Sequence, residues 1–359
     1  MATPVVIYGC GILGRSLIRD ICYNQEKSGS SLYVKGIIDP TMDINQLLYL
    51  LKYDSINSQF SGYRENLSIT IKDASTTPAY LDINGTDIPF YTQKITVDDD
   101  QGAVLGIISG SYFIECTGTW TTAGGQINAL NNAPYAVILP YNYGGNDIAY
   151  ITMVNLENIE SGTYKYQLGD LALGPISGID WIICDNSLST GPIQHVLVTG
   201  ATNAQKIQDA ATSSDYARGR SAMTNIIPLV GNVGKQVGRV VPELNGKVYS
   251  SEVRVPLASG CLLKTIFTPK SSTVDAASIN AVLRQNAPSE VLGDYTEDLI
   301  TTSDVPYHYT SKFGAPVALA SKTYSDANAI AEITCIYEPI WCMVYLTQQV
   351  IAKIVSVNS

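Results

Sequence analysis

A segment near the middle of the chain, WIICDNSLSTGP at residues 181–192, combines a thiol with a serine-rich turn, as a nucleophile site does. A thiol becomes nucleophilic at neutral pH only when an adjacent base or a positive field lowers its pKa. The thiol is Cys184, which ends an apolar run that predicts a strand. The chain has only two histidines, His195 and His308, so a mechanism with a histidine base has few candidates. We predict that Cys184 is a buried packing residue, with a relocated nucleophile as the alternative.

A glycine-rich turn near the N-terminus has the spacing of a nucleotide-binding site. Gly9, Gly11 and Gly14 lie between an apolar strand at residues 4–9 and an amphipathic helix. Glycines at this spacing let a pyrophosphate approach the N-terminus of the helix. Asp39 ends the next apolar strand, where a carboxylate accepts a hydrogen bond from a ribose hydroxyl. The pattern predicts a Rossmann unit.

The elements that position these residues fall into two groups. Short apolar strands continue to about residue 190, whereas longer alternating strands and helices such as residues 274–287 follow. The last residues, VYLTQQVIAKIVSV, form an amphipathic helix that could return to the first group. We predict an α/β chain. Its Rossmann-type domain comprises residues 1–187 with 338–359, and its α+β second domain, on a mostly antiparallel sheet, comprises residues 188–337.

Composition narrows the classes of function. The net charge of −10 argues against a nucleic-acid partner, since phosphate binding needs a basic face. We expect an intracellular protein with no membrane partner, because no segment reaches roughly 18 consecutive apolar residues and no leader pattern precedes the first strand. The 7 cysteines are scattered without CxxC spacing, which predicts no metal site. Charged residues are only 15%, and 23 tyrosines against 5 phenylalanines favour contacts between proteins.

Blocks of residues along nearly the whole chain resemble one family, glyceraldehyde-3-phosphate dehydrogenase. The blocks that carry the resemblance occur in the order and spacing of the family; they include YGCGILGRSLIRDI, ECTGTWTT, RGRSAMTNIIP, VVPELNGK and VLGDYTED. The resemblance implies a Rossmann domain that includes the C-terminal helix, a second domain with an eight-stranded sheet, and a tetramer. It also implies an NAD-dependent reaction with a cysteine nucleophile and a histidine base.

The nucleophile and the base are both replaced in this alignment. The family's cysteine lies in a Ser-Cys-Thr-Thr turn that opens a helix. The alignment puts Leu188 at the cysteine position, and the helix that should follow is almost absent before the strand at residue 193. The family's histidine aligns with Thr199 or a neighbour, and His195 is out of register with that position. The sequence therefore predicts no catalytic residue at either place.

The phosphate sites implied by the resemblance are partly retained. Arg254 matches the family's phosphate-binding arginine, and Thr202 aligns with a threonine of the same site. The second site should contain Thr-Gly, but Gly231-Asn232 stands there. Both Arg254 and Arg220 are predicted to form structural ion pairs instead.

The adenosine half of the implied cofactor site is present, and the nicotinamide half is not. Thr117 joins Gly9, Gly11, Gly14 and Asp39 as the cofactor-binding set implied by the resemblance. Pro339 stands where the family has an asparagine that holds the carboxamide, and a proline offers no donor. Met343 replaces a tyrosine of the same region, and Ile12 replaces an arginine beside the glycine turn.

These departures favour a protein that is not an enzyme. We expect a structural protein that acts by self-assembly, as a homo-tetramer or a higher-order assembly, in the extreme a crystalline inclusion or viral occlusion-body matrix in the cytoplasm. No cofactor is expected beyond weak NAD binding. One alternative is a regulatory protein that binds NAD or another nucleotide. The other is an active NAD-dependent dehydrogenase that uses Cys184.

Overall fold

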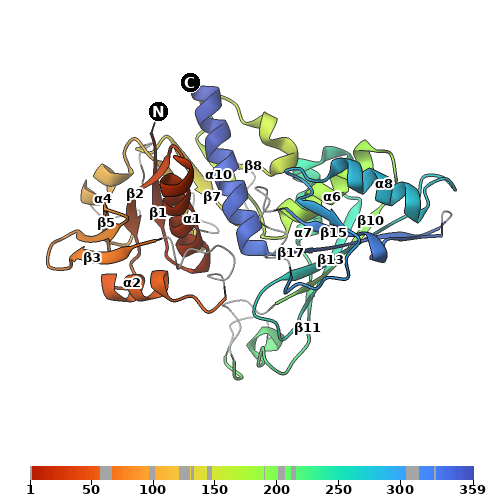
Figure 1. Ribbon diagram of the computed structural model, residues 1–359, viewed down its shortest axis with the longest axis horizontal. Coiled ribbons are helices and arrows are strands. Elements are labelled where there is room, and N and C mark those ends of the chain that lie inside the picture. Colours follow the sequence, from red (N-terminus) through yellow and green to blue (C-terminus); the bar gives the residue numbers. More distant parts are fainter. Residues whose placement is uncertain are drawn as a thin grey trace. The chain divides into compact units, whose positions relative to one another are not determined.

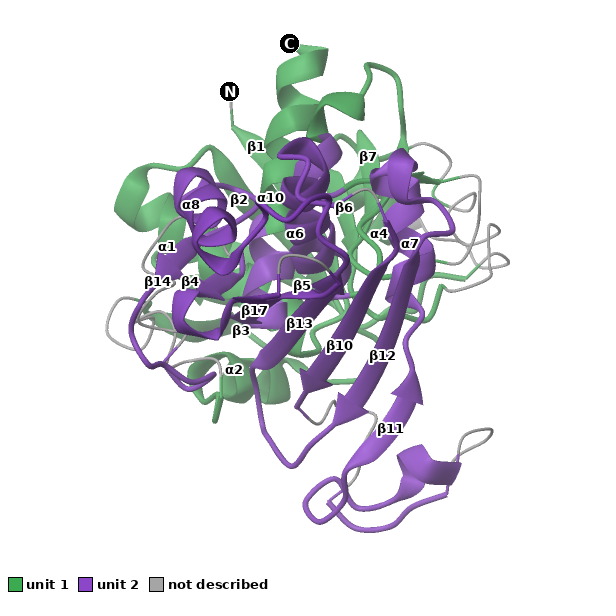
Figure 2. Cartoon of the chain, turned by 90° about the vertical axis from the view of Figure 1, so that its right-hand side faces the viewer, with its two compact units in different colours: residues 1–151, 156–170, 346–359 green, residues 152–155, 171–345 purple. Residues whose placement is uncertain are grey.

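The computed structural model describes most of the chain, in two compact units (Figure 2). Unit 1 comprises Met1–Ile151, Leu156–Asp170 and Leu346–Ser359, and unit 2 comprises Thr152–Asn155 and Leu171–Tyr345. The contacts place residues 171–187 in unit 2, whereas the sequence-based division placed them in the first domain. The described residues are 2–56, 67–96, 102–120, 130, 133–143, 148–189, 191–200, 207–211, 216–304, 315–326 and 329–359.

Unit 1 contains a nine-stranded sheet in the described residues, in the order β3-β4-β5-β2-β1-β6-β7-β9-β8. The six strands from β5 to β9 are parallel and follow the 3-2-1-4-5-6 order of a doubly wound fold, which confirms the predicted Rossmann architecture. The strands are β1 (Thr3–Tyr8), β2 (Leu32–Ile38), β3 (Ile69–Asp73), β4 (Ala79–Ile83), β5 (Thr86–Tyr91), β6 (Tyr112–Glu115), β7 (Ala136–Leu139), β8 (Ala149–Tyr150) and β9 (Lys165–Gln167).

Helix α1 (Ile12–Ser28) packs along β1 and β2, as Figure 1 shows. Its buried residues Leu17, Ile18 and Ile21 recur at helical spacing, so one apolar face meets the sheet. Gly29 ends the helix in the left-handed conformation that glycine adopts without strain. The other helices that unit 1 contains or shares are α2 (Ile44–Lys52), α4 (Gly102–Ile108), the 3₁₀ segment η2 (Met153–Asn158) and α10 (Pro339–Asn358).

Helix α10 carries the last residues of the chain into unit 1. Val350, Ile351 and Ile354 are fully buried there, and Gln348 donates a hydrogen bond of 2.5 Å to Asp20 of α1. By length and composition, α10 is the only described helix that could cross a membrane, but half of its most apolar window is already buried. That burial is typical of a core helix.

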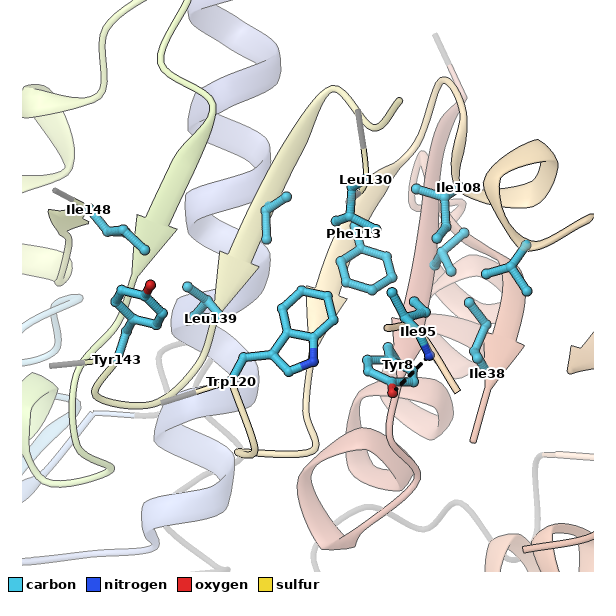
Figure 3. Packing of buried hydrophobic residues seen from close by; sticks show 13 residues of the cluster. Tyr8, Ile38, Ile95, Ile108, Phe113, Trp120, Leu130, Leu139, Tyr143 and Ile148 are labelled. Carbon is cyan, nitrogen blue, oxygen red and sulfur yellow. Dashed lines mark hydrogen bonds between the residues drawn. The ribbon is translucent and has the colours of Figure 1, made fainter. Parts of the chain in front are cut away.

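An aromatic cluster forms the core beside the carboxyl ends of β1 and β6 (Figure 3). The ring of Trp120 lies 5.6 Å from that of Tyr8 and 5.8 Å from that of Phe113, centroid to centroid. Trp120 follows the loop that leaves β6, and it is almost completely buried. This anchor fixes the loop of residues 116–119 beside the glycine turn.

The described residues of unit 2 form an eight-stranded sheet whose main order is β11-β12-β10-β13-β17-β15-β14, with β16 paired to β17. Most neighbouring strands are antiparallel, as predicted. The strands are β10 (Ile193–Thr199), β11 (Ile227–Val230), β12 (Val248–Arg254), β13 (Cys261–Phe267), β14 (Asp294–Thr296), β15 (Val317–Leu319), β16 (Tyr324–Ser325) and β17 (Ala331–Tyr337). The helices are α6 (Leu173–Asp185), α7 (Val233–Val240) and α8 (Ala276–Asn286), with 3₁₀ segments η3 (Tyr216–Gly219), η4 (Pro242–Leu244) and η5 (Ala320–Lys322).

Helix α6 corrects one expectation. The apolar run that ends at Cys184 is helical rather than a strand. Ile176, Ile179 and Ile183 are fully buried at spacings of three and four residues. A short apolar run does not by itself distinguish a buried helix from a buried strand, which is why the prediction was wrong.

Candidate functional site

The glycine turn between β1 and α1 has the close approaches that its spacing predicts. Gly9 has a φ of 97°, and its N–H donates to Ile38 at 2.8 Å. A Cβ on Gly14 would lie 2.0 Å from the carbonyl oxygen of Gly9, so only glycine fits. A Cβ on Gly11 would meet nothing within 4 Å. The turn therefore leaves open space at Gly11, directly before the first helical N–H groups of α1.

Asp39 lies beside this turn, where the sequence predicts it. Its Oδ2 accepts a hydrogen bond of 2.6 Å from the N–H of Cys10, and its Oδ1 accepts from the N–H and hydroxyl of Thr41 at 2.8 and 2.7 Å. An ionised carboxylate has about four acceptor positions, so three are occupied and about one remains. The carboxylate is thus held rigidly and can still accept one ribose hydroxyl.

Thr117 reaches the same place from the end of β6. A Cβ on Gly9 would lie 2.7 Å from the N and Cγ2 atoms of Thr117, so the two predicted segments do meet. Glu115 holds the loop: its carboxylate accepts from the N–H of Thr117 at 2.7 Å, from the Thr117 hydroxyl and from the Tyr141 hydroxyl. Burial raises the pKa of Glu115. The sequence analysis missed this glutamate, although a charged residue ending the apolar strand YFIE was a visible signal.

Leu188 does not open a helix. It follows α6, its N–H donates to Ile183 at 2.9 Å, and its side chain is buried. The helix that precedes β10 begins with Ala172 as its N-cap, and the residues before it, Gly169 to Leu171, include no cysteine. Leu188 therefore carries no nucleophile and lies in the turn after α6, and the segment directly before α6 contains no thiol either.

Cys184 lies on the last turn of α6 and is half-buried. Burial and, after it, the charge of Asp180 raise the pKa of the Cys184 thiol to about 11. The thiolate is the reactive form of cysteine, so this thiol is not activated at neutral pH.

The expected base position is at the carboxyl end of β10. Thr199 donates a hydrogen bond of 3.1 Å to Glu252 of β12, and Arg254 forms an ion pair of 2.5 Å with the same carboxylate. Strand pairing sets Thr199 opposite Arg254 on one side and opposite Cys261 on the other. The predicted structural ion pair of Arg254 is therefore present, and it uses Glu252, which the sequence analysis did not consider.

His195 is fully buried four residues before Thr199. Its Nε2 lies 3.0 Å from Oδ2 of Asp180, and its Nδ1 lies 3.1 Å from the hydroxyl of Thr265. The other Asp180 oxygen, Oδ1, is buried and has no hydrogen-bond partner within the described part of the chain. This pair ties α6 to the sheet, and its buried position makes it a packing element of unit 2.

Glu338 lies beside the end of β17 and is buried. It accepts from the Trp341 N–H and from the Ser259 hydroxyl, each at 2.8 Å, and so caps the first turn of α10. Burial raises the pKa of Glu338 to about 7, against these hydrogen bonds, which favour the carboxylate. Burial and, after it, the charge of Glu338 raise the pKa of the Cys261 thiol.

The other residues predicted for the sites lie at the start of a helix, in the core or in an ion pair. Pro339 opens α10 and Met343 is buried on it, so neither presents a hydrogen-bonding side chain. Arg220 forms an exposed ion pair of 2.8 Å with Asp209. Asn232 precedes α7 without a side-chain capping bond.

Within the described ranges, no group of three or more His, Cys, Asp or Glu is arranged for a metal ion. Two further predicted residues, Thr202 and His308, lie outside the described residues.

Comparisons with known proteins agree on one family. Residues 183–331 match the model of the glyceraldehyde 3-phosphate dehydrogenase C-terminal domain. A Claviceps purpurea protein named glyceraldehyde-3-phosphate dehydrogenase is 30% identical over 320 residues, which cover 85% of this chain and 85% of that protein. A Mucor circinelloides protein named glyceraldehyde-3-phosphate dehydrogenase 2 is 29% identical over 308 residues, 85% of this chain and 84% of that protein.

These relatives contradict two expectations of the sequence analysis. They are named as enzymes, which overturns the prediction that the chain is not an enzyme. A dehydrogenase needs a redox cofactor, and this family uses NAD, which overturns the prediction of no cofactor. Both errors have one cause: replaced catalytic residues were given more weight than the intact dinucleotide turn.

Proposed function

Because this chain belongs to the glyceraldehyde-3-phosphate dehydrogenase family, we propose that it is an NAD-dependent dehydrogenase that binds the dinucleotide at the β1–α1 turn. The observation that carries this proposal is the open space at Gly11, framed by Asp39 and Thr117. NAD, when bound, supplies the hydride acceptor.

The residues present fit the adenosine half of NAD. The N–H groups that begin α1 are directed at the pyrophosphate position, because a helix N-terminus with no capping side chain leaves its first donors unused. Asp39 offers one acceptor position for a ribose hydroxyl. The Glu115 carboxylate keeps the Thr117 loop in place beside Gly9. These groups bind and orient the cofactor and exclude water from the turn.

The nicotinamide half is held differently from the family pattern. Pro339 has no donor for the carboxamide, and Met343 is buried. The family's thiol chemistry also has no support at the expected position, since Leu188 stands there and the nearby thiol of Cys184 has a raised pKa. The contacts in the structure therefore support cofactor binding at the β1–α1 turn, and no residue is assigned as the nucleophile.

Calorimetric titration of the protein with NAD tests the proposal. We expect saturable binding, with ADP-ribose binding about as tightly as NAD, because the contacts in the structure all belong to the adenosine half. AMP should compete for the same site. No heat with millimolar NAD would overturn the proposal.

We also propose that the protein self-associates inside the cell through the edge of the unit 2 sheet. Figure 2 shows β11 as the outermost strand beside β12, and an edge strand presents unpaired backbone groups. Val230 is 78% exposed, and Ile226, Met223 and Tyr249 are also largely exposed nearby in the sequence or on the next strand. Exposed apolar side chains of this kind favour contact with a second copy. This edge supports a homo-tetramer or a higher-order assembly.

Replacement of Val230 by lysine tests the self-association. We expect Val230→Lys to lower the molar mass measured by light scattering, because a charge at the edge opposes strand and apolar contacts. Leu299→Lys is the matched control, since Leu299 is 82% exposed and follows β14, at the opposite end of the strand order from β11. A protein that is monomeric before any substitution, or a mass unchanged in Val230→Lys, would contradict the proposal.

A further inference from the structure

The Glu115 carboxylate joins two loops at the carboxyl edge of the unit 1 sheet. Glu115 is the last residue of β6 and is completely buried. Its Oε1 accepts from the N–H of Thr117 at 2.7 Å and from the Thr117 hydroxyl, and its Oε2 accepts from the hydroxyl of Tyr141, two residues after β7. Strands β6 and β7 are parallel neighbours, so both loops leave the sheet at the same edge. Doubly wound sheets bind their ligands at this edge.

The loop that carries Thr117 is ordered through this carboxylate. The Thr117 hydroxyl accepts a hydrogen bond of 3.1 Å from the N–H of Thr119 and donates its own proton to Glu115. A chain of hydrogen bonds along the loop therefore ends on the carboxylate. The loop also lies against the glycine turn, because a Cβ on Gly9 would be 2.7 Å from the N atom of Thr117. A change at the carboxylate is thus passed to the loop beside the turn.

The contacts of Glu115 fit its ionised form. An ionised carboxylate only accepts hydrogen bonds, and both oxygens of Glu115 accept here. Protonation removes the charge that strengthens these bonds and turns one oxygen into a donor. Burial raises the pKa of Glu115, whereas the hydrogen bonds from Thr117 and Tyr141 act against that rise. The carboxylate is therefore present above this raised pKa and is lost as the pH falls through it.

Titratable groups face Glu115 from its own loop and from two neighbouring elements. They are Cys116 in the loop, Tyr8 on β1 and Tyr141 after β7. Burial and, after it, the charge of Glu115 raise the pKa of each of these three groups. All three are therefore neutral in the range where Glu115 titrates. The charge of a second carboxylate, Asp39 at the end of β2, also acts on Tyr8.

We propose that Glu115 is a positioning residue for the dinucleotide: it holds the Thr117 loop in its binding shape only as a carboxylate, so NAD binds more weakly once Glu115 takes up a proton. The inference rests on the proposed NAD binding at the β1–α1 turn. Glu115 acts through Thr117, because its own oxygens are occupied by the loop and by Tyr141. The affinity for NAD should therefore follow the charge of Glu115.

Calorimetric titration with NAD, from about pH 5 to about pH 8.5, tests the role of Glu115. We expect the affinity of the unsubstituted protein to be constant at the alkaline end and to fall about tenfold as Glu115 is protonated. Glu115→Gln keeps one acceptor oxygen but no charge. It should bind NAD about tenfold more weakly at the alkaline end and show no such fall. Asp39 and NAD titrate alike in both proteins, so the difference between the two curves belongs to Glu115.

Tyr141→Phe supplies a readout that a merely structural residue would not change. The Tyr141 hydroxyl donates to the carboxylate and so lowers the pKa of Glu115. Its loss should move the fall in NAD affinity to higher pH, by up to about one unit, and leave the affinity at the alkaline end nearly unchanged. Tyr164→Phe is the matched control, since the buried Tyr164 hydroxyl of unit 1 has no hydrogen-bond partner among the described residues. It should leave the pH profile where it is.

Three results would overturn the inference and leave NAD binding at the turn standing. They are an NAD affinity of the unsubstituted protein that does not change with pH, the same pH profile in folded Glu115→Gln, and an unmoved profile in Tyr141→Phe. The third does not depend on Glu115→Gln folding, and circular dichroism at each pH reports the fold of every protein. Absence of NAD binding at every pH would instead overturn the proposed function, and this inference with it.

Discussion

The Gly11→Asp variant is expected to fold as stably as the unsubstituted protein and to lose NAD affinity by at least about a hundredfold. Gly11 is the N-cap of α1, its backbone has ordinary negative φ, and a side chain there meets open space. Aspartate is among the best N-cap residues, since its carboxylate accepts from the first helical N–H groups. The same carboxylate would take the donors of the pyrophosphate and repel its charge.

Gly11→Ser is the matched control for this variant. Serine also caps the helix, but it adds no charge and little volume, so NAD affinity should fall far less than in Gly11→Asp. Gly106→Ala, at another open glycine in unit 1, should leave binding unchanged. NAD titration and thermal unfolding measure both quantities on each protein. Equal NAD affinity in Gly11→Asp and Gly11→Ser would show that the pyrophosphate does not lie at this turn.

The second large effect is expected at His195. The His195→Leu variant should lose about 3–5 kcal/mol of unfolding free energy, because the Asp180 carboxylate would stay buried without its partner. Oδ1 of Asp180 already lacks a hydrogen-bond partner among the described residues, so none of these residues would replace His195 as a partner of the carboxylate. Urea unfolding can be followed through Trp181, the neighbour of Asp180 on α6.

Two further variants separate charge from packing at this pair. The double variant Asp180→Leu/His195→Leu should recover most of the lost free energy, since apolar residues of similar volume often replace a buried ion pair at little cost. Thr265→Val removes only the neutral hydrogen bond to His195 and should cost about 1 kcal/mol. A loss in His195→Leu no larger than that in Thr265→Val would contradict a stabilising role for the buried contact between His195 and Asp180.

The sequence predicted the Rossmann unit well because its signals are local. The glycines, the following helix and Asp39 lie within forty residues, and their spacing alone fixes the turn geometry. The alternating strands of unit 2 were recognised for the same reason, since a period of two residues is visible in the sequence. Helix α6 was missed because it is buried on most sides, so its residues show no polar face.

The polar contacts of the candidate site were not visible in the sequence. Glu252 and Thr199 are separated by 53 residues, and His195 and Asp180 join a strand to a helix that was expected to be a strand. Strand register determines which of these side chains meet, and that register cannot be read from the sequence before the strand pairing is known.

The path of the chain through α10 also decides the order in which the protein can fold during synthesis. Most of unit 1 comes from the first 170 residues, yet Val350, Ile351 and Ile354 of its core come from the last 14. The ribosome therefore synthesises Leu346–Ser359 of unit 1 only after all of unit 2. Until then the part of the unit 1 core that Val350, Ile351 and Ile354 complete lacks these side chains, and apolar surface exposed in this way favours association of nascent chains.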